Sequence, residues 1–261
     1  MHFEHLHYDV ENFVATVIID RPPVNALNRE LVAELSAVAE QIEEDVQANH
    51  VRSVVITSAG KYFSAGADLK ERVGMEESLV APTVKNVGAA INKLAEISVP
   101  TIAAIQGSAM GGGFEVALAA DIRIIVDTAQ VGLRETALAI IPGAGGTQRL
   151  TRLVGPSHAI WWITSAGLFS AQEAVQHGAV NVVVSAEELM RKARGVAEQI
   201  AGNGPLAVRQ AKRAIKEGLD KPLREGLRFE FECYKKIIST KDRLEGLNAF
   251  QEKRPPDYSG T

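Results

Sequence analysis

The sequence predicts an α/β fold in which strand and helix units repeat and a helical C-terminal region follows. Apolar runs of strand length, at 51–57, 101–107 and 122–126, alternate with helical stretches over the first two-thirds of the chain. From about Ser157 onward the pattern is mostly helical. We therefore expect a repeated ββα core over residues 1–195 and a helical region over 196–261.

The N-terminal segment predicts a hairpin followed by an amphipathic helix. Residues 3–10 and 13–19 are rich in β-branched and aromatic residues, and the polar pair Glu11 and Asn12 separates them, which is typical of two short strands. Asn28 can then cap a helix. The apolar positions of this helix keep a spacing of three or four residues: Leu31, Leu35, Val38, Ile42 and Val46.

The middle of the chain predicts a parallel sheet. A helical stretch through 84–94 lies between the runs 51–57 and 101–107, and the order strand, helix, strand implies parallel strands. A second, shorter helical segment at 113–120 leads into the run 122–126, so the alternation repeats.

The helical C-terminal third contains three expected helix starts. Ser170 and Ser185 each stand three residues before a glutamate, as in a capping box, and Pro205 suits the first turn of a helix. Only residues 179–184 are strand-like there.

Composition excludes several classes of function. The net charge of -4 and the pI near 5.9 give no general attraction to nucleic acid or to anionic membranes. A single cysteine, Cys233, cannot form an internal disulfide, and no Cys and His spacing suggests zinc. His5 and His7 lie on one face of the first predicted strand. Two histidines there are more typical of a solvent-exposed strand edge than of a metal site, so we expect no metal. Because the N-terminus lacks a basic and apolar leader, we expect a cytoplasmic protein that does not bind membranes.

The strongest local feature is a glycine-rich loop at 106–115 between a buried strand and a helix. Gly111, Gly112 and Gly113 allow unusual backbone dihedrals and can bring free N–H groups at the start of a helix close to a ligand oxygen. A second loop of small residues, 60–70, also follows a buried strand. Either loop alone could be a tight turn, but two such loops at the carboxyl ends of neighbouring parallel strands would face one crevice and form an oxyanion hole.

Two glutamates are candidates for proton transfer. Glu115 lies one helical turn past the glycines, so its side chain can face the same pocket, although it could simply balance the helix dipole. Glu135 is flanked by apolar segments, which is unusual for an acid. A partner such as Arg134 or a capping N–H group is the alternative explanation for Glu135.

Four segments form a set in chain order: Ser64-Ala-Gly-Ala-Asp-Leu-Lys70, Gly111-Gly-Gly-Phe-Glu115, Ala119-Ala-Asp-Ile-Arg123 and Ile141-Pro-Gly-Ala-Gly-Gly-Thr-Gln-Arg-Leu150. Together they resemble the motifs of the enoyl-CoA hydratase/isomerase superfamily, the crotonases. The resemblance covers nearly the whole chain, since 240–247 and 249–253 also match. It implies a crotonase fold with a helical trimerisation region, trimers paired into hexamers, and an acyl-CoA substrate without a separate cofactor.

The resemblance also implies roles at individual positions. The two oxyanion N–H groups fall on Ala67 and Gly112, and the two hydratase carboxylates fall on Glu115 and Glu135. Residues implied to lie along coenzyme A are Ala26, Ala65, Asp68 and Leu69. Phe250 and Lys253 are implied to reach the coenzyme A bound to a neighbouring subunit.

The implied reaction is addition of water to trans-2-enoyl-CoA, which gives 3-hydroxyacyl-CoA in the degradation of fatty or branched-chain acyl groups. The two donors polarise the thioester carbonyl while one carboxylate accepts a proton from water and the other delivers a proton to C2. We assign Glu115 mainly as the base and Glu135 mainly as the acid. An enoyl-CoA isomerase is an alternative, since isomerases of the superfamily generally need one carboxylate.

Arg134 departs from the pattern, because many hydratases carry proline directly before the second glutamate. A cation at Arg134 could lower the pKa of Glu135 or meet an acidic substrate tail. The segments 67–72, 138–141, 240–247 and 253–256 especially resemble methylglutaconyl-CoA hydratases, which is a second alternative.

Some methylglutaconyl-CoA hydratases also bind AU-rich RNA, and the related proteins carry a lysine-rich first helix. Here residues 29–50 set Arg29 against the acids Glu30, Glu34, Glu40, Glu43, Glu44 and Asp45, a face that repels phosphates. One basic cluster has helical spacing and predicts a solvated helix face instead: Arg191, Lys192, Arg194, Arg209, Lys212, Arg213 and Lys216. We expect no nucleic acid partner.

Overall fold

The computed structural model describes residues 3–261 and opens with the predicted hairpin. Strands β1 (Leu6–Glu11) and β2 (Val14–Ile19) pair antiparallel. The turn lies at Asn12 and Phe13, which have φ values of 51° and 64°, as a two-residue turn between twisted strands requires. The turn is therefore one residue later than the polar pair Glu11 and Asn12 suggested.

The main sheet confirms the predicted α/β class and its parallel strands. Its order is β1-β2-β3-β4-β6-β9, and every pair after the hairpin is parallel. The added strands are β3 (Ser53–Ser58), β4 (Thr101–Ile105), β6 (Ile122–Val126) and β9 (Val182–Val184). β3 and β4 are buried along their whole length, which explains their mainly apolar sequences.

Helix α1 (Arg29–Gln47) begins as predicted, because the side chain of Asn28 accepts the N–H of Leu31. Helix α3 (Glu77–Glu96) contains the predicted stretch 84–94 but starts seven residues earlier than it. Pro82 near its first turns hid this start, since proline in a helix interior usually ends a helix. The short helix α2 (Leu69–Arg72), capped by Asp68, was not predicted.

A small second sheet adjoins the glycine-rich loop. It joins β5 (Ala109–Met110), β7 (Gln130–Gly132) and β8 (Phe169–Ser170), and α4 (Gly112–Ala119) starts directly after β5. A single bridge between Ser64 and Ala109 ties the two predicted loops to each other, and a second, between Leu27 and Ala67, ties the loop 60–70 to the segment before α1.

After β7 the chain continues through the helices α5 (Gly146–Thr164), α6 (Ala171–Gln176) and α7 (Leu189–Ala201). Ser170 and Glu173 form the predicted capping box. The predicted helix start at Ser185 is wrong, since α7 begins at Leu189. A turn closed by the N–H of Glu188 on the carbonyl of Ser185 occupies the residues between.

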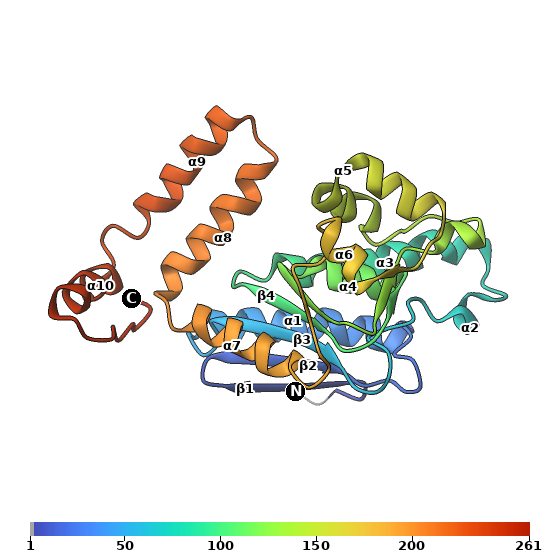
Figure 1. Cartoon of the computed structure of the whole chain (residues 1–261), viewed down its shortest axis with the longest axis horizontal. Helices are drawn as coiled ribbons and strands as arrows, with labels where there is room; N and C mark the ends of the chain where they lie inside the picture. Colours follow the sequence, from blue (N-terminus) through green and yellow to red (C-terminus); the bar gives the residue numbers. More distant parts are fainter. Residues whose placement is uncertain (1–2) are drawn as a thin grey trace.

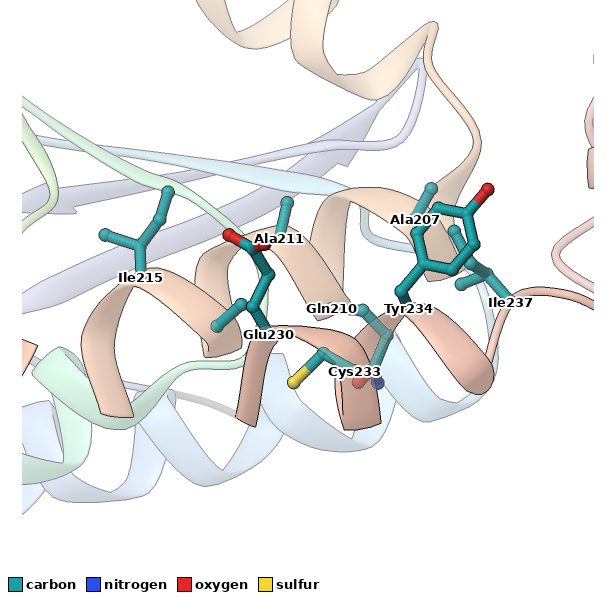
Figure 2. Close-up of a pocket in the computed structure, with 9 residues that line it drawn as sticks. Ala207, Gln210, Ala211, Ile215, Glu230, Cys233, Tyr234 and Ile237 are labelled. Atoms are coloured by element: carbon teal, nitrogen blue, oxygen red, sulfur yellow. The ribbon is translucent and has the colours of Figure 1, made fainter. Parts of the chain in front are cut away.

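The C-terminal region forms an arm of three helices at one end of the molecule, opposite α2 (Figure 1). The helices are α8 (Pro205–Leu219), which starts at the predicted proline, α9 (Leu223–Lys235) and α10 (Lys241–Glu252). A cavity of about 370 Å³ lies between α8 and α9, where Ala207 and Ala211 face Cys233 and Tyr234 (Figure 2). The predicted boundary after residue 195 falls within α7, and the division into two regions stays a prediction.

Charged side chains, of which those of Lys212 and Arg52 are largely buried, fix the arm to the core. Asp121, before β6, pairs with Lys212 at 2.6 Å and Lys216 at 2.8 Å on α8. Burial lowers the pKa of Lys212 to about 8 despite the nearby Asp121. At the other end of the arm, the guanidinium of Arg52 donates to the carbonyl of Tyr258 at 2.9 Å.

Within residues 3–261, helices are either too short or too polar to cross a membrane.

Candidate active site

The two predicted loops meet at their glycines. A β-carbon on Gly66 would stand 2.7 Å from the carbonyl oxygen of Met110 and 3.2 Å from the nitrogen of Gly112. Gly66 and Gly111 have φ values of 90° and 52°, so both occupy backbone regions that favour glycine. The small residues seen in the sequence thus serve a close approach of two backbones.

The N–H groups of Ala67 and Gly112 lie side by side at this contact. A β-carbon on Gly112 would stand 3.7 Å from the Ala67 nitrogen. Neither N–H group donates to an acceptor among residues 3–261, and Gly112 is the first residue of α4, where helical N–H groups lack partners. Two adjacent free donors can bind one carbonyl oxygen and stabilise negative charge on it.

Glu115 lies in α4, and its side chain is held from one side. Its Oε1 accepts the N–H groups of Ala144 and Gly146, both at 2.8 Å. Burial raises the pKa of Glu115, although these two N–H groups and Arg149 partly oppose the rise. Its Oε2 stands 3.8 Å from where a β-carbon on Gly112 would lie, so the second oxygen faces the free donors.

Glu135 reaches the same place from another element, the first residue of the 3-10 helix η1 (Glu135–Leu138). Burial raises the pKa of Glu135 to about 7, and the charge of Glu115 adds to the rise. Its Oε2 is buried and has no hydrogen-bond partner among residues 3–261. Glu135 therefore combines a raised pKa with a free oxygen, as a proton donor near neutral pH requires.

Arg134 does not lower the pKa of Glu135, so that expectation is wrong. Its Nε donates to the carbonyl of Ala166 at 3.2 Å, and no ion pair joins it to Glu135 within the described residues. A capping N–H does contribute, since the backbone N–H of Glu135 itself opposes the rise in its pKa.

Two cavities adjoin at the donors and share Ala67, Gly112 and Glu135. The larger, about 520 Å³, contains all four residues expected along coenzyme A: Ala26, Ala65, Asp68 and Leu69. The smaller, about 340 Å³, contains Glu115 and is otherwise mainly apolar. We call the smaller cavity the inner chamber. The arrangement suits a ligand with a long polar part outside, a carbonyl at the donors, and a short apolar part inside.

Asp68 has a structural role as well as a place in the larger cavity. It pairs with Arg21 at 2.9 Å and caps α2 by accepting the N–H of Lys70. It thereby holds the segment that carries the Ala67 N–H.

Phe250 and Lys253 do not approach this site in the same chain. Both are on or directly after α10, and Figure 1 shows α10 and α2 at opposite ends of the molecule. Phe250 is 86% exposed. The structure therefore does not bring these two residues to the site of their own chain, and their expected contact with coenzyme A on a neighbouring subunit stays a prediction.

The structure also adds residues that the sequence did not identify. The N–H groups of Ala144 and Gly146 belong to the glycine-rich segment after Ile141. The sequence showed this segment but not that it binds Glu115. Most residues that line the inner chamber were not predicted to belong to the site: Leu27, Met75, Val80, Val84, Val87 and Ile141.

Among residues 3–261, no three His, Cys, Asp or Glu side chains gather as metal ligands would. The basic cluster predicted to be a solvated face is largely ion-paired, as Arg194 is with Glu11 and Arg213 with Glu217. Lys212 departs from that prediction, because its side chain is only 9% exposed.

Comparison with known proteins identifies relatives of this chain in sequence and in structure. The sequence profile described as enoyl-CoA hydratase/isomerase matches residues 9–261. The chain is 47% identical over 249 residues to probable enoyl-CoA hydratase 2, mitochondrial, of Arabidopsis thaliana, covering 95% of this chain and 82% of that protein. It is 47% identical over 241 residues to mouse mitochondrial methylglutaconyl-CoA hydratase, covering 90% and 76%. A crystal structure of enoyl-CoA hydratase from Bacillus anthracis superposes with a TM-score of 0.95 at 46% identity, covering 99% and 100%.

Proposed function

Because the chain belongs to the enoyl-CoA hydratase/isomerase family, we propose that it adds water reversibly to trans-2-enoyl-CoA and forms 3-hydroxyacyl-CoA. The observation that carries this proposal is the meeting of two unpaired N–H donors, on Ala67 and Gly112, with two carboxylates, the buried Glu115 and the partly buried Glu135.

The donors act on the thioester. Bound to its carbonyl oxygen, the N–H groups of Ala67 and Gly112 withdraw electrons, make C3 electrophilic and stabilise the enolate that forms when water adds. Removal of one oxyanion-hole donor in an enzyme that catalyses acyl transfer costs about 3 to 4 kcal/mol of barrier, and we expect a similar order here.

The carboxylates divide the proton transfers. Two N–H bonds favour the charged form of Glu115, so it accepts a proton from water as the oxygen attacks C3. Glu135, whose pKa is about 7, is substantially protonated at neutral pH and delivers its proton to C2. The catalytic cycle closes when Glu115 loses the proton gained and Glu135 regains one.

The proposed enzyme works as an oligomer, a trimer or a pair of trimers. The arm exposes a row of large apolar side chains that a lone chain would leave in water: Ile215, Leu219, Leu223, Leu227, Phe231 and Tyr234. Such a contact would let Phe250 and Lys253 reach coenzyme A on a neighbour. Light scattering coupled to size exclusion tests the oligomer, and a monomer at micromolar concentration would contradict it.

Two alternative reactions use the same site. Methylglutaconyl-CoA hydration is favoured by the mouse relative of that name, and isomerisation by the breadth of the family. The pathway, fatty or branched-chain acyl degradation, depends on this choice. The cytoplasmic location stays a prediction, since relatives include mitochondrial proteins and one from Bacillus subtilis.

The test is loss of the enoyl thioester absorbance with crotonyl-CoA and, separately, with methylglutaconyl-CoA. Hydration of either supports the proposal. Hydration of neither contradicts it, and conversion of a 3-enoyl-CoA to the 2-enoyl form would then assign the isomerase reaction.

A further inference from the structure

The inner chamber contains one cation. Most of its wall is apolar, from Leu27, α3 and the segment 138–141. Its charged residues are the carboxylates Glu115 and Glu135 at one end and Arg72 of α2. The proposed reaction gives Arg72 no part.

Arg72 is half-buried and unpaired. Its guanidinium makes no hydrogen bond or ion pair with any of residues 3–261. Nearby arginines differ: Arg21 pairs with Asp68, and Arg149 donates to the carbonyl of Ala144 at 2.9 Å. A guanidinium without a protein partner at the wall of a substrate chamber is free to bind a carboxylate, so Arg72 points to an anionic part of the ligand.

The position of Arg72 suits the far end of an acyl group. Ala67 supplies a carbonyl donor, and α2 begins two residues later at Leu69. Arg72 is three residues further, about 4.5 Å along a helix axis. A short acyl chain that leaves the donors and passes the two glutamates therefore ends near α2 and α3.

Resting on the proposed function, we infer that Arg72 binds a carboxylate at the distal end of the acyl group. The preferred substrate is then a short 2-enoyl-CoA with a terminal carboxylate. The charge of Glu115 alone would repel such a group, and Arg72 offsets that repulsion. Arg134 is a poorer candidate, because it lines only the larger cavity and its Nε is bound to Ala166.

The experiment compares two substrates that differ in one group. Glutaconyl-CoA ends in a carboxylate, and trans-2-pentenoyl-CoA carries a methyl group in its place. We expect the wild type to prefer glutaconyl-CoA in kcat/KM, and Arg72→Met to lower that value on the order of 100-fold. Pentenoyl-CoA should change by less than about threefold, since it makes no ionic contact. Arg72→Lys should restore part of the glutaconyl-CoA activity.

Three results would overturn the inference. One is an equal loss with both substrates, which would mean a structural role. The second is a wild type that prefers pentenoyl-CoA. The third is loss of the glutaconyl-CoA preference in Arg134→Met while Arg72→Met keeps it.

Binding separates this inference from the hydratase proposal. Calorimetry with the saturated thioesters glutaryl-CoA and pentanoyl-CoA needs no turnover. If the wild type hydrates neither enoyl substrate but binds glutaryl-CoA more tightly, and Arg72→Met abolishes that difference, the role of Arg72 stands while hydration fails. Equal affinities in the wild type would refute the role of Arg72 alone.

Discussion

Glu135 lies directly against Gly111, so closely that a β-carbon on this glycine would stand 3.0 Å from Glu135 Oε1. Gly111 also precedes the proposed donor Gly112. One residue thus fixes the spacing between an acid and an oxyanion donor.

Replacement of Gly111 by alanine should therefore impair both groups. The methyl group displaces the Glu135 carboxylate, and a φ of 52° with ψ of -129° is strained for alanine. We expect kcat to fall at least about tenfold and the free energy of unfolding to fall by about 1 to 3 kcal/mol. Gly195→Ala is the matched control, because Gly195 lies in helix α7 with open space around it. Normal kcat in Gly111→Ala would show that the contact is unimportant.

Amide replacements of the two acids test their roles directly. Glu115→Gln and Glu135→Gln keep the side-chain shape and remove proton transfer, so each should lose turnover by orders of magnitude. Binding of a saturated acyl-CoA, measured by calorimetry, should persist. Near-normal turnover in either variant refutes the role assigned to that residue.

The pH dependence of the rate should follow Glu135. Burial raises its pKa to about 7, and the proton-donating form is lost as the pH rises through that value. We expect kcat/KM for hydration to decline above about pH 7 in the wild type. A profile that is flat from pH 6 to 9 would mean that another group supplies the proton.

The stability of the fold should also depend on pH through Glu135. A carboxylate in an ion pair stabilises the fold as the pH rises, whereas Glu135 should destabilise it. The folded chain binds the Glu135 proton more tightly than the unfolded chain, whose pKa is near 4.5. The free energy of unfolding therefore falls as the pH rises from about 4.5 to 7. With solvent screening of a partly exposed side chain, the loss is on the order of 1 to 2 kcal/mol.

Glu135→Gln removes this term, so chemical denaturation should find the variant more stable than the wild type at pH 8 and nearly equal to it at pH 4.5. Equal stability at both pH values would contradict the raised pKa.

The attachment of the arm can be tested at Asp121. Asp121→Asn removes the partner of two lysines, of which Lys212 is the more buried, and breaking a buried pair typically costs about 3 kcal/mol or more. Lys235→Gln is the control, since its pair with Glu232 is exposed and is worth less than about 1 kcal/mol. Denaturant unfolding of both variants gives the comparison. Similar losses would mean that the Asp121 pair is no stronger than a surface pair.

The sequence predicted those parts of the molecule that depend on local patterns. The cap at Asn28, the capping box at Ser170 and the buried strands follow from the chemistry of a few adjacent residues. The start of α3 was predicted wrongly because Pro82 is tolerated inside this helix.

The site was predictable only in part, since loop composition indicates free N–H groups but not their partners. Glu115 was a candidate from its place after the glycines, whereas its bonds to Ala144 and Gly146 join segments about thirty residues apart. The inner chamber depends on residues of α2 and α3 lining one cavity, which no local pattern contains. The unpaired state of Arg72 is likewise visible only when all its neighbours are placed.

The charged cluster of Asp121, Lys212 and Lys216 has a geometric consequence. It ties α8 to the segment before β6 and so restrains the direction of the arm. In a head-to-tail contact, the rotation from one copy to the next determines whether a ring closes and after how many copies. A loosened cluster would permit several rotations and hence open chains of varied length. In the proposed trimer, three side chains far from the reacting atoms would thus determine the symmetry of the assembly.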